Sequence, residues 1–242
     1  MGDMFEPKCP VVDSERVWID ENMDWFRGQF GDEWLSRPVV LPTDEYFPGV
    51  FAGSPDDVRA AVARVGTYMG VDLDRVVVDF HEGGRDDPLA RAIGAASRWS
   101  GAAGHYRTVN GKAVVSLEES LAGAPRVLVA TIAHELAHVR LLGEERVPPE
   151  RADQEPLTDL LTVYLGMGVF AANASLEFSS TGRRWSATRL GYLTEPMFGY
   201  ALARYARMRG EPDPAWARHL DTNPRTFLKK GLRYLSLSSR GP

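Results

Sequence analysis

The most continuous hydrophobic pattern in the chain covers residues 126–142, where apolar side chains occupy almost every face of a predicted helix. A helix with this pattern is buried, yet it carries His134, Glu135 and His138 near its centre. Buried polar side chains are costly without partners, so these three are expected either to share a bound group or to hydrogen-bond within the core. A second apolar helix is predicted from about residue 153.

Shorter periodic segments predict the elements around these two helices. Residues 76–80 predict a buried strand, and residues 104–117 predict a β-hairpin because Asn110-Gly111 separates two alternating runs. The same spacing rules predict amphipathic helices at 14–28, 54–70 and 188–209, the first two capped by Ser14 and Ser54 and the last interrupted near Pro196.

The order of these elements predicts an α+β fold, in which a small mixed sheet with an edge hairpin packs on the 126–142 helix. From about residue 155 the chain is mostly helical. Residues 51–242 are long enough to form a single domain, and residues 1–50 are predicted to be an N-terminal extension packed on its core. This extension could be a lid, an inhibitory segment or part of the core.

Composition narrows the class of protein. The 242 residues carry a formal net charge of −5, which argues against nucleic acid as the main partner. The single cysteine suits a reducing compartment, and residues 1–10 lack the pattern of a signal peptide. The longest apolar stretch, 160–174, is shorter than the roughly 20 residues that a membrane span needs. We therefore expect a cytoplasmic protein without a membrane span; its oligomeric state is left open.

The segment His134-Glu135-Leu136-Ala137-His138 has the spacing of a zinc-hydrolase motif. Residues four apart lie on one face of a helix, with Cβ atoms roughly 5–6 Å apart, so both imidazoles can reach one Zn²⁺ ion. Glu135 projects from a neighbouring face and is the expected general base toward a water on that ion.

A catalytic zinc usually has three protein ligands, and the third is expected on the second helix. Glu155 and Asp159 are four residues apart and share a face there. We expect Glu155 to bind the metal and Asp159 to accept the outer N–H of His134, because the longer side chain lies earlier in the helix. The alternative is that Asp159 itself is the ligand.

At these residues the chain resembles the gluzincins, thermolysin-like metallopeptidases in which His-Glu-x-x-His is followed by Glu-x-x-x-Asp on the next helix. The resemblance covers residues 125–175 and rests on the two motifs. It implies a zincin-like fold, with Glu155 as third ligand and a peptide or protein substrate paired to an edge strand within 104–117. The metzincin pattern is absent, because Leu141 and Glu144 stand where it requires Gly and His.

The gluzincin resemblance also implies a Tyr or His that stabilises the oxyanion, contributed by the C-terminal part of the chain. Tyr192 and His219 are the candidates there, and His105 and Tyr106 on the hairpin are further options. No local motif distinguishes among these four residues.

Cys9 is a further potential zinc ligand, and two known classes of zinc enzyme use a cysteine in this way. The segment Pro7-Lys8-Cys9-Pro10 resembles the latency switch of matrix metalloproteinases, in which a thiolate occupies the open zinc position. Deformylases, another class of zinc hydrolase, also pair the histidine motif with a cysteine ligand. Their cysteine lies in a Gly-Cys-Leu segment, whereas Cys9 lies between Lys8 and Pro10.

Two functions follow from the pattern. The first is a zinc-dependent metallopeptidase. The second is a non-catalytic, zinc-stabilised binding or regulatory module, which a fourth protein ligand such as Cys9 or Asp159 would indicate.

Overall fold

The computed structural model describes residues 7–81, 104–109, 112–180 and 192–238. The N-terminal half contains α1 (Asp13–Phe30), α2 (Glu33–Ser36), α3 (Pro55–Met69), η1 (Leu73–Arg75), β1 (Val76–His81), β2 (Gly104–Val109), β3 (Lys112–Glu118) and η2 (Glu119–Gly123). The C-terminal half contains α5 (Pro125–His138), the π-helical turn η3 (Val139–Gly143), α6 (Gln154–Tyr164), α7 (Gly168–Ser180), α8 (Glu195–Met208), η4 (Ala215–His219) and α9 (Thr222–Ser238).

Within the described residues the strands form one three-stranded sheet in the order β1-β3-β2. β1 runs parallel to β3 with Val78 opposite Val115, and β2 runs antiparallel to β3 with Tyr106 opposite Val115. The predicted strand is present, and β2 and β3 pair as expected for the predicted hairpin, whose Asn110-Gly111 turn lies outside the described residues. The strand is not fully buried, however, because Val77 is 43% exposed. β3 is the central strand and β2 lies at an edge.

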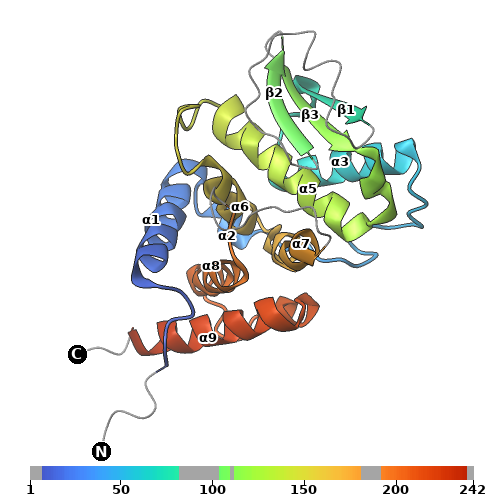
Figure 1. Cartoon of the computed structure of the whole chain (residues 1–242). Coiled ribbons are helices and arrows are strands. Elements are labelled where there is room, and N and C mark those ends of the chain that lie inside the picture. Colours follow the sequence, from blue (N-terminus) through green and yellow to red (C-terminus); the bar gives the residue numbers. More distant parts are fainter. Residues whose placement is uncertain (1–6, 82–103, 110–111, 181–191, 239–242) are drawn as a thin grey trace, which may run out of the picture.

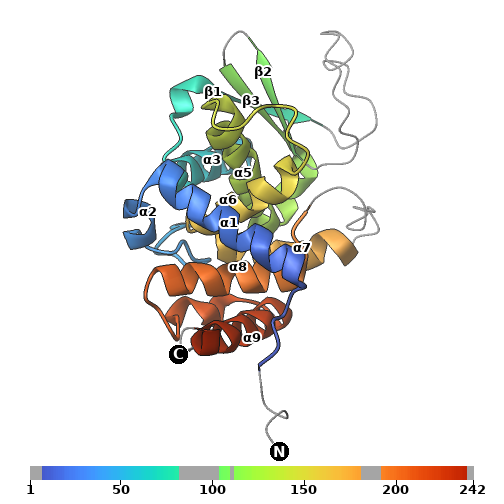
Figure 2. The ribbon, with the colours of Figure 1, turned by 90° about the vertical axis from the view of Figure 1, so that its left-hand side faces the viewer.

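The elements are stacked in layers, from the sheet through α3 and α5, then α6 and α7, to α8 and α9 (Figure 1 and Figure 2). α5 contacts β2 and β3 on one side and α6 and α7 on the other, so it lies in the middle of the molecule. This arrangement confirms the predicted α+β class, with a small mixed sheet on the motif helix and a helical C-terminal part.

α1 crosses the layers and contacts both α6 and α8 (Figure 2). Its residues Ile19, Met23 and Phe26 are fully buried and belong to the same apolar cluster as the residues of α5 and α6. The helix begins at Asp13, so the predicted N-cap at Ser14 was wrong. Glu15 accounts for the earlier start, because its carboxylate accepts the N–H of Val12 at 3.2 Å.

Local signals set the ends of the other helices. Ser54 caps α3 as predicted, since its hydroxyl accepts the Asp57 N–H at 3.2 Å. The motif helix begins at Pro125 and continues beyond His138 as the π-helical turn. α8 begins at Glu195 because Pro196 fits the first turn of a helix better than its interior. The predicted residues 188–191 lie outside the described residues.

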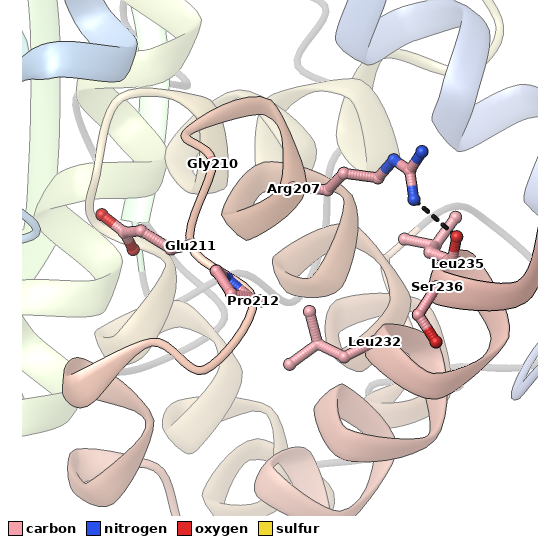
Figure 3. A pocket seen from close by; sticks show the side chains of 7 residues that line it. All are labelled: Arg207, Gly210, Glu211, Pro212, Leu232, Leu235 and Ser236. Carbon is pink, nitrogen blue, oxygen red and sulfur yellow. Dashed lines mark hydrogen bonds between the residues drawn. The ribbon is translucent and has the colours of Figure 1, made fainter. Parts of the chain in front are cut away.

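α8 and α9 pack closely against each other. A Cβ atom on Gly231 would come within 2.7 Å of the Ala203 Cβ atom, so the absence of a side chain permits the close approach. A cavity of about 270 Å³ opens at the ends of these helices, where Arg207 donates to the Leu235 carbonyl (Figure 3). Among the described residues, no helix combines the length and apolarity needed to span a bilayer.

Candidate metal centre

Three potential metal ligands meet where α5 packs against α6. His134 and His138 lie one turn apart on α5, with ring centroids 4.8 Å apart, and Glu155 projects from the first turn of α6. One donor atom from each residue lies within 4.8 Å of the others. All three are largely buried, with side-chain exposures of 13%, 8% and 10%. The structure thus brings together the three residues that the sequence proposed as ligands.

The spacing of the donor atoms suits a small divalent cation. The Nε2 atom of His134 is 3.1 Å from Glu155 Oε2, and the Nε2 atom of His138 is 3.5 Å from Glu155 Oε1. In a tetrahedral zinc site with bonds of 2.0–2.1 Å, neighbouring donor atoms lie roughly 3.3–3.4 Å apart. Two imidazoles and one carboxylate are also a common donor set for zinc. The residues present therefore fit the ion.

Asp159 fixes the orientation of His134. Its Oδ1 atom is 2.9 Å from His134 Nδ1, and a carboxylate can only accept, so the Nδ1 atom carries the proton and Nε2 faces Glu155. Burial alone would lower the pKa of His134, but the hydrogen bonds with Asp159 and Glu155 outweigh it and raise the pKa well above its usual value. The contact expected between Asp159 and His134 is therefore present.

Thr158 fixes the orientation of the His138 ring. Its hydroxyl donates to the Gln154 carbonyl at 2.8 Å, so toward His138 Nδ1, at 3.2 Å, the oxygen must accept. His138 then carries a proton on Nδ1, and its Nε2 atom faces Glu155 Oε1 at 3.5 Å. The side chain of Thr158 is fully buried. Sequence reasoning missed this residue, although its position three residues after Glu155 places it on the same helix face.

Glu155 is held in its charged form. Burial alone would raise its pKa, but hydrogen bonds with His134 and His138 and the charges of these rings lower it far below its usual value. A carboxylate that stays deprotonated is always available as a metal ligand.

Glu135 lies beside the cluster, and its pKa is shifted in the opposite direction to that of Glu155. Its side chain is almost fully buried, with 3% of the residue exposed, and its Oε2 atom has no hydrogen-bond partner among the described residues. Burial raises the pKa of this carboxyl group, while the neighbouring His138 and His134 lower it to a smaller extent. A buried carboxylate oxygen without a partner is costly, so a bound molecule or ion is a candidate partner for Glu135.

Tyr192 also reaches the cluster. Its ring centroid is 5.6 Å from that of His134, and its hydroxyl hydrogen-bonds with Glu155. Burial, together with the charges of Glu155 and Asp159, raises its pKa far above the usual value, so the phenol remains a proton donor at neutral pH. The neighbouring Leu193 N–H donates to Asp159 Oδ2 at 3.0 Å and fixes this segment against α6.

His219 does not meet the cluster. His219 accepts a hydrogen bond from Arg218 on its ring and one from Asn173 on its carbonyl, so it belongs to the junction between η4 and α7. β2 places His105 and Tyr106 in the sheet, but their side chains lie outside the described residues.

Cys9 does not reach the cluster either. It packs at the core near Arg16 and Asp20 of α1, and burial raises the pKa of its thiol. A raised pKa disfavours the thiolate that a latency switch or a metal ligand requires. Cysteine 9 is therefore a poor candidate for either role.

Comparisons with protein-family models, with curated proteins and with solved structures found no match to this chain. What the protein does must therefore follow from the chemistry of its own residues.

Proposed function

We propose that this chain is a zinc-dependent metallopeptidase with a zincin-like fold. One observation carries the proposal: His134, His138 and Glu155 converge while both histidine Nδ1 atoms are already engaged by Asp159 and Thr158. Hydrogen-bond partners on the outer nitrogen are typical of metal-binding histidines, and they leave three donor atoms pointing at one position.

The remaining groups support hydrolysis rather than a purely structural metal. A structural zinc is closed by a fourth protein ligand. Among the described residues the cluster has three members, and both Asp159 oxygens are occupied by His134 and Leu193. Within the described residues no fourth ligand joins the three, which favours an enzyme, with a coordination position for water or substrate, over a zinc-stabilised binding module.

When bound, the zinc ion would polarise the scissile carbonyl and make a water molecule acidic near neutral pH. Glu135 would accept the proton of the attacking water and pass it to the leaving amine, because its Oε2 atom lacks a hydrogen-bond partner among the residues that the structure describes. Tyr192 would donate its phenolic proton in a hydrogen bond to the carbonyl oxygen as negative charge develops.

The sheet supports an extended peptide or protein as substrate. β2 pairs only with β3 among the described strands, and α5 contacts both of them. An extended chain added to the edge at β2 would make main-chain hydrogen bonds that do not depend on its sequence.

Metal content is the first test. We expect purified protein to hold about one zinc ion per chain by mass spectrometry, and we expect Glu155→Ala to lose it. Hydrolysis of a quenched fluorescent peptide library should require zinc and should disappear in Glu135→Gln. Zinc binding without any peptide hydrolysis would instead favour the binding module, and a wild type that never binds zinc would end the metal proposal.

A further inference from the structure

The first turn of α6 carries Glu155, and side chains other than the candidate metal ligands connect this turn to α1. The indole Nε1 atom of Trp18 donates to Asp153 Oδ2 at 2.8 Å. Arg151 donates two hydrogen bonds to the same carboxylate, from Nε to Oδ1 at 2.6 Å and from Nη2 to Oδ2 at 3.0 Å. Asp153 is thus held on both oxygens, two residues before Glu155.

Asp153 uses its side chain in an unusual way for its position. It is the N-cap residue of α6, where an aspartate usually accepts a hydrogen bond from the first turn, yet its side chain makes no such bond. Its carboxylate instead points across to Trp18 and Arg151. The helix forgoes a cap worth roughly 1 kcal/mol, and the hydrogen bonds that replace it fix where α6 begins relative to α1.

The link extends along one face of α1. Arg151 also donates to Asn22 Oδ1 at 3.1 Å, and its guanidinium lies 5.8 Å from the centre of the Trp25 ring. Asn22 is buried and donates to the Trp18 carbonyl at 2.8 Å, which fixes its amide group. Trp18, Asn22 and Trp25 follow the i, i+4, i+7 spacing of a single helix face.

We propose that Trp18 is a positioning residue of the metal centre and that α1 sets the reach of the Glu155 carboxylate. The inference rests on the proposed zinc site. Groups that orient a ligand tune metal affinity even when they do not touch the metal. Only Gln154 lies between Asp153 and Glu155, so a shift of this turn moves the carboxylate relative to His134 and His138.

The chain provides a matched control at the opposite side of α1. The Tyr200 hydroxyl of α8 donates to Asp20, with distances of 3.2 and 3.1 Å to the two carboxylate oxygens. Tyr200→Phe therefore removes a hydrogen bond that holds α1, as Trp18→Phe does, but this bond leads to α8 rather than to α6.

The test is zinc affinity, measured by competition with a chromophoric chelator, together with urea unfolding of the metal-free protein. We expect Trp18→Phe to weaken zinc binding about 3–10-fold, less than the 10–100-fold typical of a group that directly contacts a ligand. Tyr200→Phe should stay within about twofold of wild type, even where the two variants lose similar stability.

A second variant separates positioning from general loosening. Asp153→Ser keeps a good N-cap residue but cannot reach Trp18, so it should weaken zinc binding by a similar factor. The double variant should lose no more than Asp153→Ser alone, because that change already removes the hydrogen bond to Trp18.

If wild type binds zinc and both Trp18→Phe and Asp153→Ser bind it with unchanged affinity, the positioning role of Trp18 is wrong while the proposed function stands. Wild type that does not bind zinc would overturn the proposed function, and this inference with it.

Discussion

Asp159 joins the metal cluster to the segment that carries Tyr192, because its Oδ2 atom accepts the Leu193 N–H at 3.0 Å. Its other oxygen holds His134 Nδ1 at 2.9 Å. One carboxylate therefore fixes both a candidate metal ligand and the segment that carries the proposed proton donor. The two roles make Asp159 sensitive even to isosteric replacement.

Asp159→Asn should weaken zinc binding about 10–100-fold, the usual cost of losing a ligand's hydrogen-bond partner. An amide offers one acceptor oxygen for two N–H groups, so either His134 or Leu193 would face an NH₂ group instead. Chelator competition measures the affinity, and unaltered binding would show that Asp159 does not orient His134.

Thr158→Val should reduce zinc affinity about tenfold, because valine has nearly the same shape but cannot accept the His138 N–H. The unpaired buried donor should also lower the free energy of unfolding by roughly 1–3 kcal/mol. Thr158→Ser is the control, since it keeps the hydroxyl and should retain most of the affinity. If serine and valine behave alike, the methyl packing of Thr158 matters and its hydrogen bond does not.

Glu135→Gln should retain zinc and lose peptide hydrolysis by about 10²–10⁴-fold, because an amide cannot accept the proton of water. The variant should also be more stable than wild type without metal. Burial raises the folded-state pKa of Glu135, so its contribution favours folding at acid pH and is lost as pH rises through that pKa.

At neutral pH the charged form of Glu135 thus opposes folding, and its removal should add about 0.5–2 kcal/mol in urea unfolding of the metal-free protein. A less stable variant would mean that the carboxylate has a partner in the fold.

Tyr192→Phe should lower kcat about 10²-fold while zinc content stays the same, since the ring still packs on His134 but no phenol donates to the substrate. Steady-state kinetics and metal analysis on the same samples give both readouts. Lost zinc with unchanged kcat per bound ion would assign the hydroxyl to holding Glu155 instead.

The candidate metal ligands could be predicted from the sequence more completely than the contacts that surround them. Residues four apart on one helix must share a face, so His134 and His138 could be paired from spacing alone. The acidic start of the next helix indicated Glu155 because its residue type matched the missing ligand. Both inferences depend on local geometry, which a sequence specifies directly.

Contacts between distant segments were not predictable in the same way. Nothing near Trp18 indicates that its indole meets Asp153, which is 135 residues away along the chain. Aspartate is a common N-cap residue, and only the packing of α1 on α6 shows that the Asp153 side chain points elsewhere. Val77 looked buried because its neighbours are apolar, but burial depends on what covers the sheet.

The three candidate ligands stand on two packed helices rather than on loops, and this has a consequence for the thermodynamics of metal uptake. The backbone conformation of α5 and α6 is set by their apolar cores, so binding an ion need not order any chain. The conformational entropy cost of binding should be small, and the far-ultraviolet circular dichroism should hardly change. Uptake would instead be governed by release of the proton and hydrogen bonds that His134 and Glu155 share.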